Sequence, residues 1–209
     1  MKIQKQNSTL VNIAEVYEKF FAQLSHVNFT VTQRMAEELK LLGAEKVSVL
    51  YDKPHSRFRR LDAEEKSALF SRLVGEIPEL AKVKKGAKLL MSSTSWTKDE
   101  DFGILLEALV ELEGKLTNDL VVIITGKGPE KSFYNKKIGE LGLKRISIVT
   151  PWLEADDYPL LLGCADLGVS LHSSSSGVDL PMKVVDMFGA GLPVLALDFP
   201  AIGISLVYN

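Results

Sequence analysis

Five apolar runs with strand character, separated by stretches with helical spacing, constrain the fold of this chain more than any other feature. Along the second part of the chain these runs read KLLMSS, DLVVIIT, ISIVT, DLGVSLH and PVLALD. Runs that are apolar nearly throughout are typical of strands buried on both faces of a parallel sheet. Strands that alternate with helices form right-handed βαβ units. The sequence therefore predicts a doubly wound, Rossmann-like α/β domain.

The first part of the chain has a smaller α/β pattern. Strand-like VNFTVT and KVSVLYD flank the helical QRMAEELKLLG, and a helix with its own apolar stripe precedes them. The charged segment that follows has helical spacing only in its middle, and we interpret it as a linker with one or two surface helices. The predicted organisation is a helix and one βαβ piece over residues 1–54, a linker over 55–86 and the larger domain over 87–209.

Composition excludes several classes of function. The formal net charge is −2, so no excess of positive charge would attract nucleic acid. The single cysteine, Cys164, and three histidines far apart in the sequence predict no disulfide within the chain, no metal site and no cofactor. The polar start MKIQKQNSTL predicts no signal peptide. No run reaches the roughly 18 apolar residues of a membrane span, so we expect a protein of the cytosolic side.

In a doubly wound sheet, ligands bind outside the carboxyl ends of the strands. The loop STSWTKDED follows the first strand of the larger domain and offers the hydroxyls of Thr94 and Ser95. These hydroxyls could cap the next helix or contact a phosphate, and the sequence leaves both roles open. The acids that follow, at residues 99–101, fit the first turn of a helix, where the dipole favours negative charge.

Two further loops offer candidate ligand contacts. The turn Gly126-Lys127-Gly128 leads from a strand into a helix, a geometry in which a backbone can approach a phosphate. It lacks the third glycine of a dinucleotide fingerprint, so a simple tight turn explains it as well. Trp152 follows the next strand and could either stack on a base or close the core.

The most informative loop is SSSSGVDLP, which runs into the helix MKVVDMFGAG. Lys183 and Asp186 are three residues apart and share one face of this helix. Serines, a glycine and a helix N-terminus suit an anion, whereas a carboxylate suits hydroxyl groups. Together they favour a ligand with both phosphate and hydroxyl groups, although a surface ion pair between the two side chains is the plainer alternative.

These motifs resemble those of GT-B glycosyltransferases, and most closely the chitobiosyldiphosphodolichol β-mannosyltransferases of the asparagine-linked glycan pathway. The resemblance covers roughly residues 10–198. It is carried by YEKFFAQLSHVN, VSVLYDKP, SSTSWTKDEDF, ITGKGP, TPWLEADDYPLLLG and SSSGVDLPMKVVDMFG. It implies the nucleotide-sugar-binding half of a GT-B fold, preceded by a remnant of the first GT-B domain.

The resemblance also implies a reaction. Enzymes of this family transfer mannose, with inversion, from GDP-mannose to a dolichol-diphosphate chitobiose at the cytosolic face of the endoplasmic reticulum, and no metal is required. By position, Asp186 would bind the ribose hydroxyls and Lys183 the diphosphate or sugar. The phosphates would meet the hydroxyls and amides of Ser174, Ser175, Ser176 and Gly177. The implied donor-binding residues also include Thr94, Ser95, Gly126, Lys127, Gly128 and Trp152.

Some features depart from the family pattern. Val178 stands where the wider superfamily often has the first acid of a pair, and Ser95 and Glu100 stand where it has basic residues. Compared with the family, we expect most of the first domain and its membrane anchor to be missing, and the last residues, FPAIGISLVYN, do not resemble the family's continuation. We therefore expect a truncated relative that associates with full-length relatives or with the endoplasmic reticulum membrane. The alternatives are a catalytically inactive paralogue that binds nucleotide or a partner enzyme, and an α/β module unrelated to sugar transfer.

Overall fold

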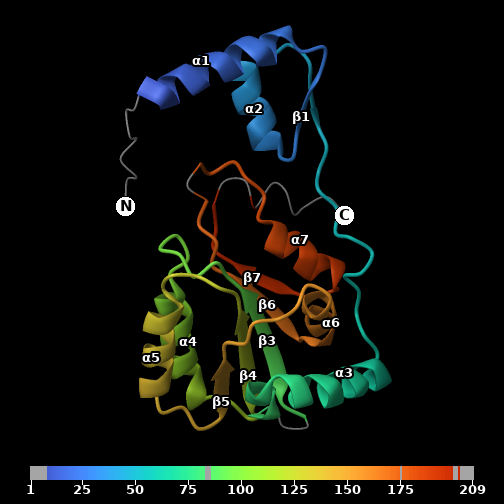
Figure 1. Ribbon diagram of the computed structural model, residues 1–209, viewed down its shortest axis with the longest axis vertical. Helices are drawn as coiled ribbons and strands as arrows, with labels where there is room; N and C mark the ends of the chain where they lie inside the picture. Colours follow the sequence, from blue (N-terminus) through green and yellow to red (C-terminus); the bar gives the residue numbers. More distant parts are fainter. Residues whose placement is uncertain (1–8, 83–85, 175, 200–201, 203–209) are drawn as a thin grey trace. The chain divides into compact units, whose positions relative to one another are not determined.

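A computed structural model describes residues 9–82, 86–174, 176–199 and 202 of the chain (Figure 1). The chain divides into two compact units. The five-stranded unit contains Lys53–His172 and Met182–Leu197. The N-terminal unit contains Met1–Asp52, Ser173–Pro181 and Asp198–Asn209.

The five-stranded unit is built on a parallel sheet with the strand order β5-β4-β3-β6-β7. Its strands are β3 (Lys88–Ser93), β4 (Leu120–Thr125), β5 (Ile146–Val149), β6 (Leu167–Ser170) and β7 (Val194–Ala196). The chain crosses from β5 to the other side of β3 before it forms β6, so the sheet is doubly wound. This order confirms the predicted α/β fold, and each strand lies within one of the five apolar runs.

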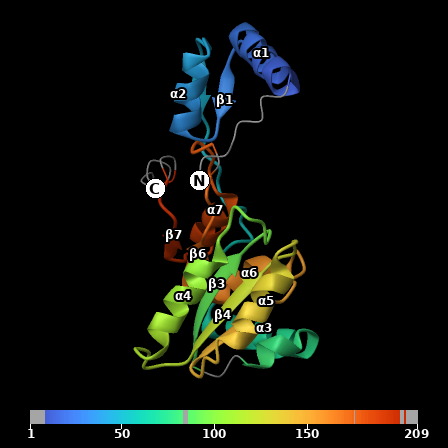
Figure 2. The same ribbon diagram turned by 90° about the vertical axis from the view of Figure 1, so that its left-hand side faces the viewer.

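Helices cover both faces of this sheet (Figures 1 and 2). One face carries α4 (Phe102–Glu113) and α5 (Lys131–Glu140). The other carries α3 (Ala63–Glu76), α6 (Asp157–Cys164) and α7 (Met182–Gly189). The central strand β3 alternates between two cores, with Leu89 and Met91 in one cluster and Leu90 in the other. Burial on both faces explains why the strand sequences are apolar nearly throughout.

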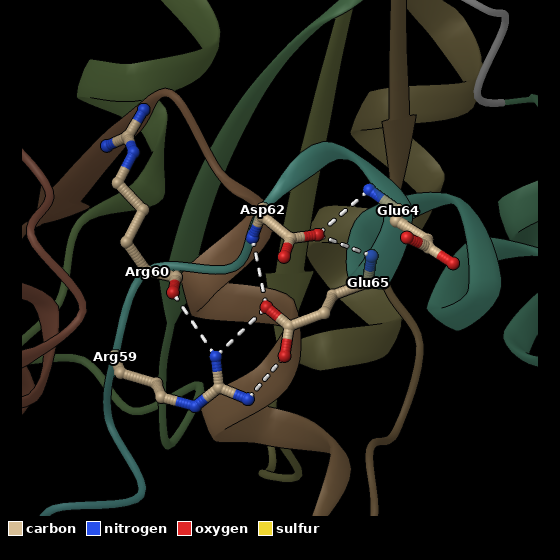
Figure 3. A network of polar contacts seen from close by, with 5 residues as sticks. All are labelled: Arg59, Arg60, Asp62, Glu64 and Glu65. Carbon is tan, nitrogen blue, oxygen red and sulfur yellow. Dashed lines mark hydrogen bonds and ion pairs between the residues drawn. The ribbon is translucent and has the colours of Figure 1, made fainter.

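A capping box begins α3 (Figure 3). The carboxylate of Asp62 accepts hydrogen bonds from the backbone amides of Glu64 and Glu65, both at 2.9 Å. The carboxylate of Glu65 accepts one from the amide of Asp62 at 3.0 Å and is also paired with Arg59. These contacts, chiefly the bond from Arg59, lower the pKa of Glu65 to about 2. The charged residues at this point therefore define where the helix starts.

The apolar side of the same segment belongs to the core of the five-stranded unit. Leu69 and Leu73 of α3 are buried, as is Leu80 of the short 3₁₀ helix Pro78–Lys82. All three lie in one cluster with residues of β3, β4 and α6. The segment over residues 55–86, for which the sequence suggests a linker with surface helices, therefore has a charged outer face and a buried apolar one. The predicted functional division of the chain stays a prediction.

The N-terminal unit contains a parallel pair of short strands, β1 (Asn28–Thr30) and β2 (Val47–Val49). Helix α2 (Gln33–Leu41) connects them, and the hydroxyl of Thr32 caps it by accepting from the amide of Met35 at 3.1 Å. The same hydroxyl donates to the carbonyl of Val178 at 2.6 Å. This bond joins the serine-rich loop to the N-terminal unit.

Helix α1 (Thr9–Leu24) has no buried residue. Its exposed apolar side chains include Ile13, Val16, Tyr17 and Phe20. Over the described ranges of the chain, no helix combines the length and the apolar character that crossing a bilayer requires.

Candidate functional site

The loops that follow β3 and β4 are locked together at the carboxyl edge of the sheet. The amide of Thr94 donates to the carbonyl of Thr125 at 2.9 Å, and the amide of Glu130 donates to the carbonyl of Trp96 at 3.0 Å. The indole of Trp96 is fully buried against Phe102 and donates to the backbone of the neighbouring loop at 3.3 Å. Trp96 also has a φ of 48°, a backbone conformation that is uncommon for a bulky residue. The two loops therefore form one hydrogen-bonded platform.

Close packing of these loops explains the two glycines of the turn after β4. A Cβ added to Gly126 would lie 1.8 Å from the carbonyl oxygen of Thr94, and one added to Gly128 would lie 1.7 Å from that of Ser95. Gly126 also has a φ of +147°. The structure thus supplies a reason for both glycines that needs no ligand. Their approach to a phosphate stays a prediction.

The buried carboxylate of Glu100 connects this platform to α7. One of its oxygens, Oε2, accepts a hydrogen bond from the hydroxyl of Thr94 and one from the amide of Ser95, the latter at 3.1 Å. The other, Oε1, accepts from the ammonium of Lys183. Glu100 is 3% exposed, and the Lys183 side chain is 29% exposed. The structure therefore brings together three predicted site residues, Thr94, Ser95 and Lys183, through Glu100, which the sequence marked only as a departure from the superfamily pattern and not as a site residue.

The prediction that the acids of residues 99–101 lie in the first turn of a helix is wrong in detail, because α4 begins at Phe102 and its first turn holds no acid. Asp101 is the N-cap of α4 and accepts from the amide of Gly103 at 2.8 Å. Glu100 differs because its side chain turns inward. The only hint in the sequence is that Glu100 follows the hydroxyl-bearing residues Thr94 and Ser95 and precedes α4. This order does not reveal the bond from Glu100 to Lys183.

Trp152 does not close the core. The residue is 47% exposed, and the ammonium of Lys127 lies 3.8 Å from the centroid of its ring. This cation–π contact joins the loops after β4 and β5, which are neighbouring strands of the sheet. Stacking of a base on the indole stays a prediction, and a base would compete with Lys127 for this ring face.

Asp186 lies one turn further along α7 than Lys183, in a partly buried position. Burial raises the pKa of the Asp186 carboxyl, and the nearby charge of Arg57 opposes this shift. The hydroxyl of Tyr158 is 3.2 Å from that of Ser93, and burial, more than the charge of Asp186, raises the pKa of Tyr158 to about 12. Asp186 is therefore a partly buried carboxylate whose charge acts on the Tyr158 hydroxyl.

The serine-rich loop stabilises its own turn within the N-terminal unit. The hydroxyl of Ser174 donates to Asp179 and accepts from the amide of Gly177 at 2.7 Å, and Gly177 has a φ of 74°. Ser176 also contacts Asp179, at 3.3 Å. Ser175 lies outside the described residues. Contact of this loop with a phosphate stays a prediction.

Metal ligands do not gather in the part of the chain that the structure describes. There, no three side chains of the His, Cys, Asp and Glu types lie close enough together to hold a metal ion.

Solved structures of similar fold are glycosyltransferases. HepE from Anabaena, solved in complex with UDP, superposes with a TM-score of 0.69 at 17% identity and covers 100% of this chain, which covers 54% of that protein. A glycosyltransferase from Rickettsia africae superposes with a TM-score of 0.67 at 14% identity, with 95% of this chain and 51% of that one covered. The fold is thus that of the GT-B glycosyltransferases.

Sequence comparison identifies the family. The chain belongs to the glycosyl transferases group 1 family, whose pattern matches residues 75–203. Proteins named chitobiosyldiphosphodolichol beta-mannosyltransferase are 44% identical in Homo sapiens, over 92% of this chain, and 42% identical in Candida albicans, over 100% of it. These matches confirm the resemblance drawn from the motifs. The chain spans about half the length of these relatives, 48% of the human one and 46% of the yeast one.

Proposed function

We propose that the five-stranded unit binds GDP-mannose and that the chain serves β-mannosyl transfer to chitobiosyl-diphosphodolichol at the cytosolic face of the endoplasmic reticulum. The observation that carries this proposal is the arrangement of α7. It holds Lys183 against Glu100 and the β3 loop, in a chain matched almost throughout by relatives named for this transfer.

Each proposed contact follows from the chemistry of the side chain. An ammonium is a compact charge with three donors and suits the oxygens of a diphosphate. A carboxylate accepts from two vicinal hydroxyls and suits a ribose, so we assign Lys183 to the diphosphate and Asp186 to the ribose. Trp152 offers an aromatic face to the base.

A second candidate function is nucleotide binding without transfer, as part of a complex with another enzyme. It would use the same proposed contacts of Lys183, Asp186 and Trp152, because binding alone requires only contacts with the nucleotide. Transfer needs a donor and an acceptor held together beside a positioned base. A chain that binds GDP without turning over would fit this second function.

Two measurements separate these functions. Calorimetric titration with GDP, GDP-mannose and UDP shows whether the chain binds a nucleotide and prefers guanine. A transfer assay with GDP-mannose and a chitobiosyl-diphosphate lipid then shows whether it turns over. Binding with transfer supports the first function and binding without transfer the second, whereas a chain that binds no nucleotide contradicts both.

Asp186→Ala should weaken GDP binding by about 1–3 kcal/mol, the usual scale for hydrogen bonds to a charged group. The substitution removes the carboxylate proposed to accept from the ribose hydroxyls. Calorimetry measures the change. Asp156→Ala is the matched control, because Asp156 is exposed and its side chain makes no capping hydrogen bond. Equal GDP affinity in the parent and in Asp186→Ala would remove the ribose role.

Affinity for GDP-mannose should fall as the pH is lowered from 7 toward the ordinary aspartate value of about 4. Burial raises the pKa of Asp186, so this carboxylate takes up a proton, and loses its ability to accept from two hydroxyls, at a higher pH than an exposed aspartate. GDP-mannose is the suitable probe because its diphosphate is esterified at both ends and does not titrate in this range.

Unfolding of the protein caused by protonation of Asp186 does not explain the loss of affinity for GDP-mannose. A carboxyl group whose pKa is raised in the folded state contributes stability that is fully present below its unfolded pKa and is lost as the pH rises through the folded pKa. Protonation of Asp186 therefore favours the folded protein. The same titration with Asp186→Asn, which has no proton to gain, should show a flatter pH profile. An unchanged profile in that variant would assign the pH dependence to another group.

A further inference from the structure

We infer that Glu100 is a positioning residue of the donor site, which holds the ammonium of Lys183 at the carboxyl edge of the sheet for recognition of the donor's diphosphate. This inference rests on the proposed function, because that function supplies the diphosphate. It adds a residue from the β3 loop that acts through another residue and does not itself touch the ligand.

The burial of Glu100 shows that its charge is compensated by specific partners. A buried carboxylate is costly unless it is paired and hydrogen-bonded. Glu100 is 3% exposed and accepts three hydrogen bonds, from Thr94, Ser95 and Lys183. The first two donors belong to its own loop, whereas Lys183 lies 83 residues further along the chain. The pair therefore joins the β3 loop to α7.

The two oxygens of this carboxylate have separate partners. Oε2 is held by the Thr94 hydroxyl and the Ser95 amide, and this loop is itself fixed by the bond from the Thr94 amide to the carbonyl of Thr125. Oε1 is thereby fixed in space and faces Lys183. A lysine has a flexible four-carbon stem and loses considerable rotamer freedom when it is held in one place. Glu100 imposes this order before a ligand arrives.

Lys183 keeps the capacity to bind a ligand while it is paired. An ammonium has three N–H donors, and its bond to Glu100 uses one of them. The Lys183 side chain is 29% exposed, so the remaining donors can be met by ligand oxygens. The ammonium can thus bridge the fixed carboxylate and a phosphate.

A simpler role for Glu100 is to stabilise the turn at Thr94 and Ser95 alone. The substitution Glu100→Gln separates the two roles, because glutamine has a single acceptor oxygen. The backbone amide of Ser95 cannot turn away, so the oxygen is needed there and the glutamine NH₂ group is left facing Lys183. Two donors then face each other, and Lys183 loses its acceptor while the turn keeps its own.

The test is a double-mutant cycle read by calorimetric titration with GDP. Glu100→Gln and Lys183→Met should each weaken GDP binding about 10-fold, the lower end of the effect of a charged hydrogen bond, and the double variant should also be about 10-fold weaker. Glu107→Gln, the same change at an exposed position of α4, should bind like the parent. Independent roles would instead multiply to about 100-fold in the double variant, and that result would overturn the inference.

The affinity for guanosine separates a specific effect on the diphosphate from a general loosening of the site, because general loosening would lower it. Guanosine lacks the diphosphate, so its affinity should be the same in the parent, Glu100→Gln and Lys183→Met. Equal losses for guanosine and GDP would show a merely structural role. If the parent binds GDP and Glu100→Gln binds it equally well, only this inference fails. If the parent binds no GDP, both the proposed function and this inference are contradicted.

A second pair of variants applies if Glu100→Gln does not fold. Glu100→Asp keeps the charge but withdraws it by one methylene, which should weaken GDP binding several-fold. Lys183→Arg in that background has a longer reach and should restore most of the loss. Failure of this rescue, with Glu100→Asp folded and weakened, would contradict positioning through Lys183.

Discussion

Gly128→Ala should destabilise the five-stranded unit by about 3 kcal/mol or more, a large effect for the addition of one methyl group. The new Cβ would lie 1.7 Å from the carbonyl oxygen of Ser95 and 2.7 Å from its carbonyl carbon. These are backbone atoms, which cannot rotate away as the end of a side chain can. Ser95 also donates its amide to the buried Glu100, so a shift of this loop would disturb the bond to Lys183.

Unfolding in denaturant, monitored by tryptophan fluorescence, measures this change in the free energy of unfolding. Both tryptophans, Trp96 and Trp152, belong to the five-stranded unit, so the signal reports on that unit. Gly139→Ala in α5 is the control, because a Cβ there meets no atom within 4 Å. Alanine is the better helix former, so this control should be neutral or stabilising by up to about 1 kcal/mol. If Gly128→Ala unfolds at the same denaturant concentration as the parent, the two loops are not packed as described.

The strands of the large sheet were predictable because their signal is local. KLLMSS is β3 residue for residue, and each later strand lies inside its predicted apolar run. Burial on both faces leaves that signal in the sequence itself, and the helices between the strands follow from the same alternation. The order of the strands depends on contacts between distant parts of the chain, since β3 pairs with β6 although β4 and β5 lie between them in the sequence.

The site was predictable in its location but not in its contacts. The rule for parallel sheets places a ligand at the carboxyl edge, and it directs attention to the loop of Thr94 and to Lys183. The residue that joins them, Glu100, reads as one acid among three at a helix start. Its bond spans 83 positions, and no periodicity encodes a pair so far apart. The role of Gly126 and Gly128 was ambiguous for a related reason. The backbone atoms that they approach lie in the loop after β3, so the sequence of their own turn does not reveal the close packing.

The segment over residues 55–86 shows a different limit of prediction from sequence, which concerns the burial of a helix. Its charges form a capping box and exposed ion pairs, and they dominate its composition. The buried apolar positions of α3, Leu69 and Leu73, are four residues apart and so lie on one face of the helix. They are too few to reveal from sequence alone whether that face is buried against a sheet. The structure places both in the core with Met91.

Leu73→Ala should therefore destabilise the five-stranded unit by about 3 kcal/mol, within the range of about 2–5 kcal/mol for truncation of a buried leucine. Leu73 has no exposed surface and lies in the same cluster as Met91 and Leu161, so the lost methyl groups leave a cavity in the core beneath the sheet. The sheet can close this cavity only in part, because its strands are held by their ladder of hydrogen bonds.

The neighbouring position supplies the control. Val74→Ala removes a similar apolar group from a side chain that is 37% exposed on the same helix, and it should change the free energy of unfolding by about 0.5 kcal/mol or less. Fluorescence-detected unfolding of both variants measures the difference. If Leu73→Ala costs no more than Val74→Ala, α3 contributes little to the core and the segment behaves as the linker that its charges suggest. A difference of about 2 kcal/mol or more between two adjacent residues would show that this charged stretch is part of the sheet's core.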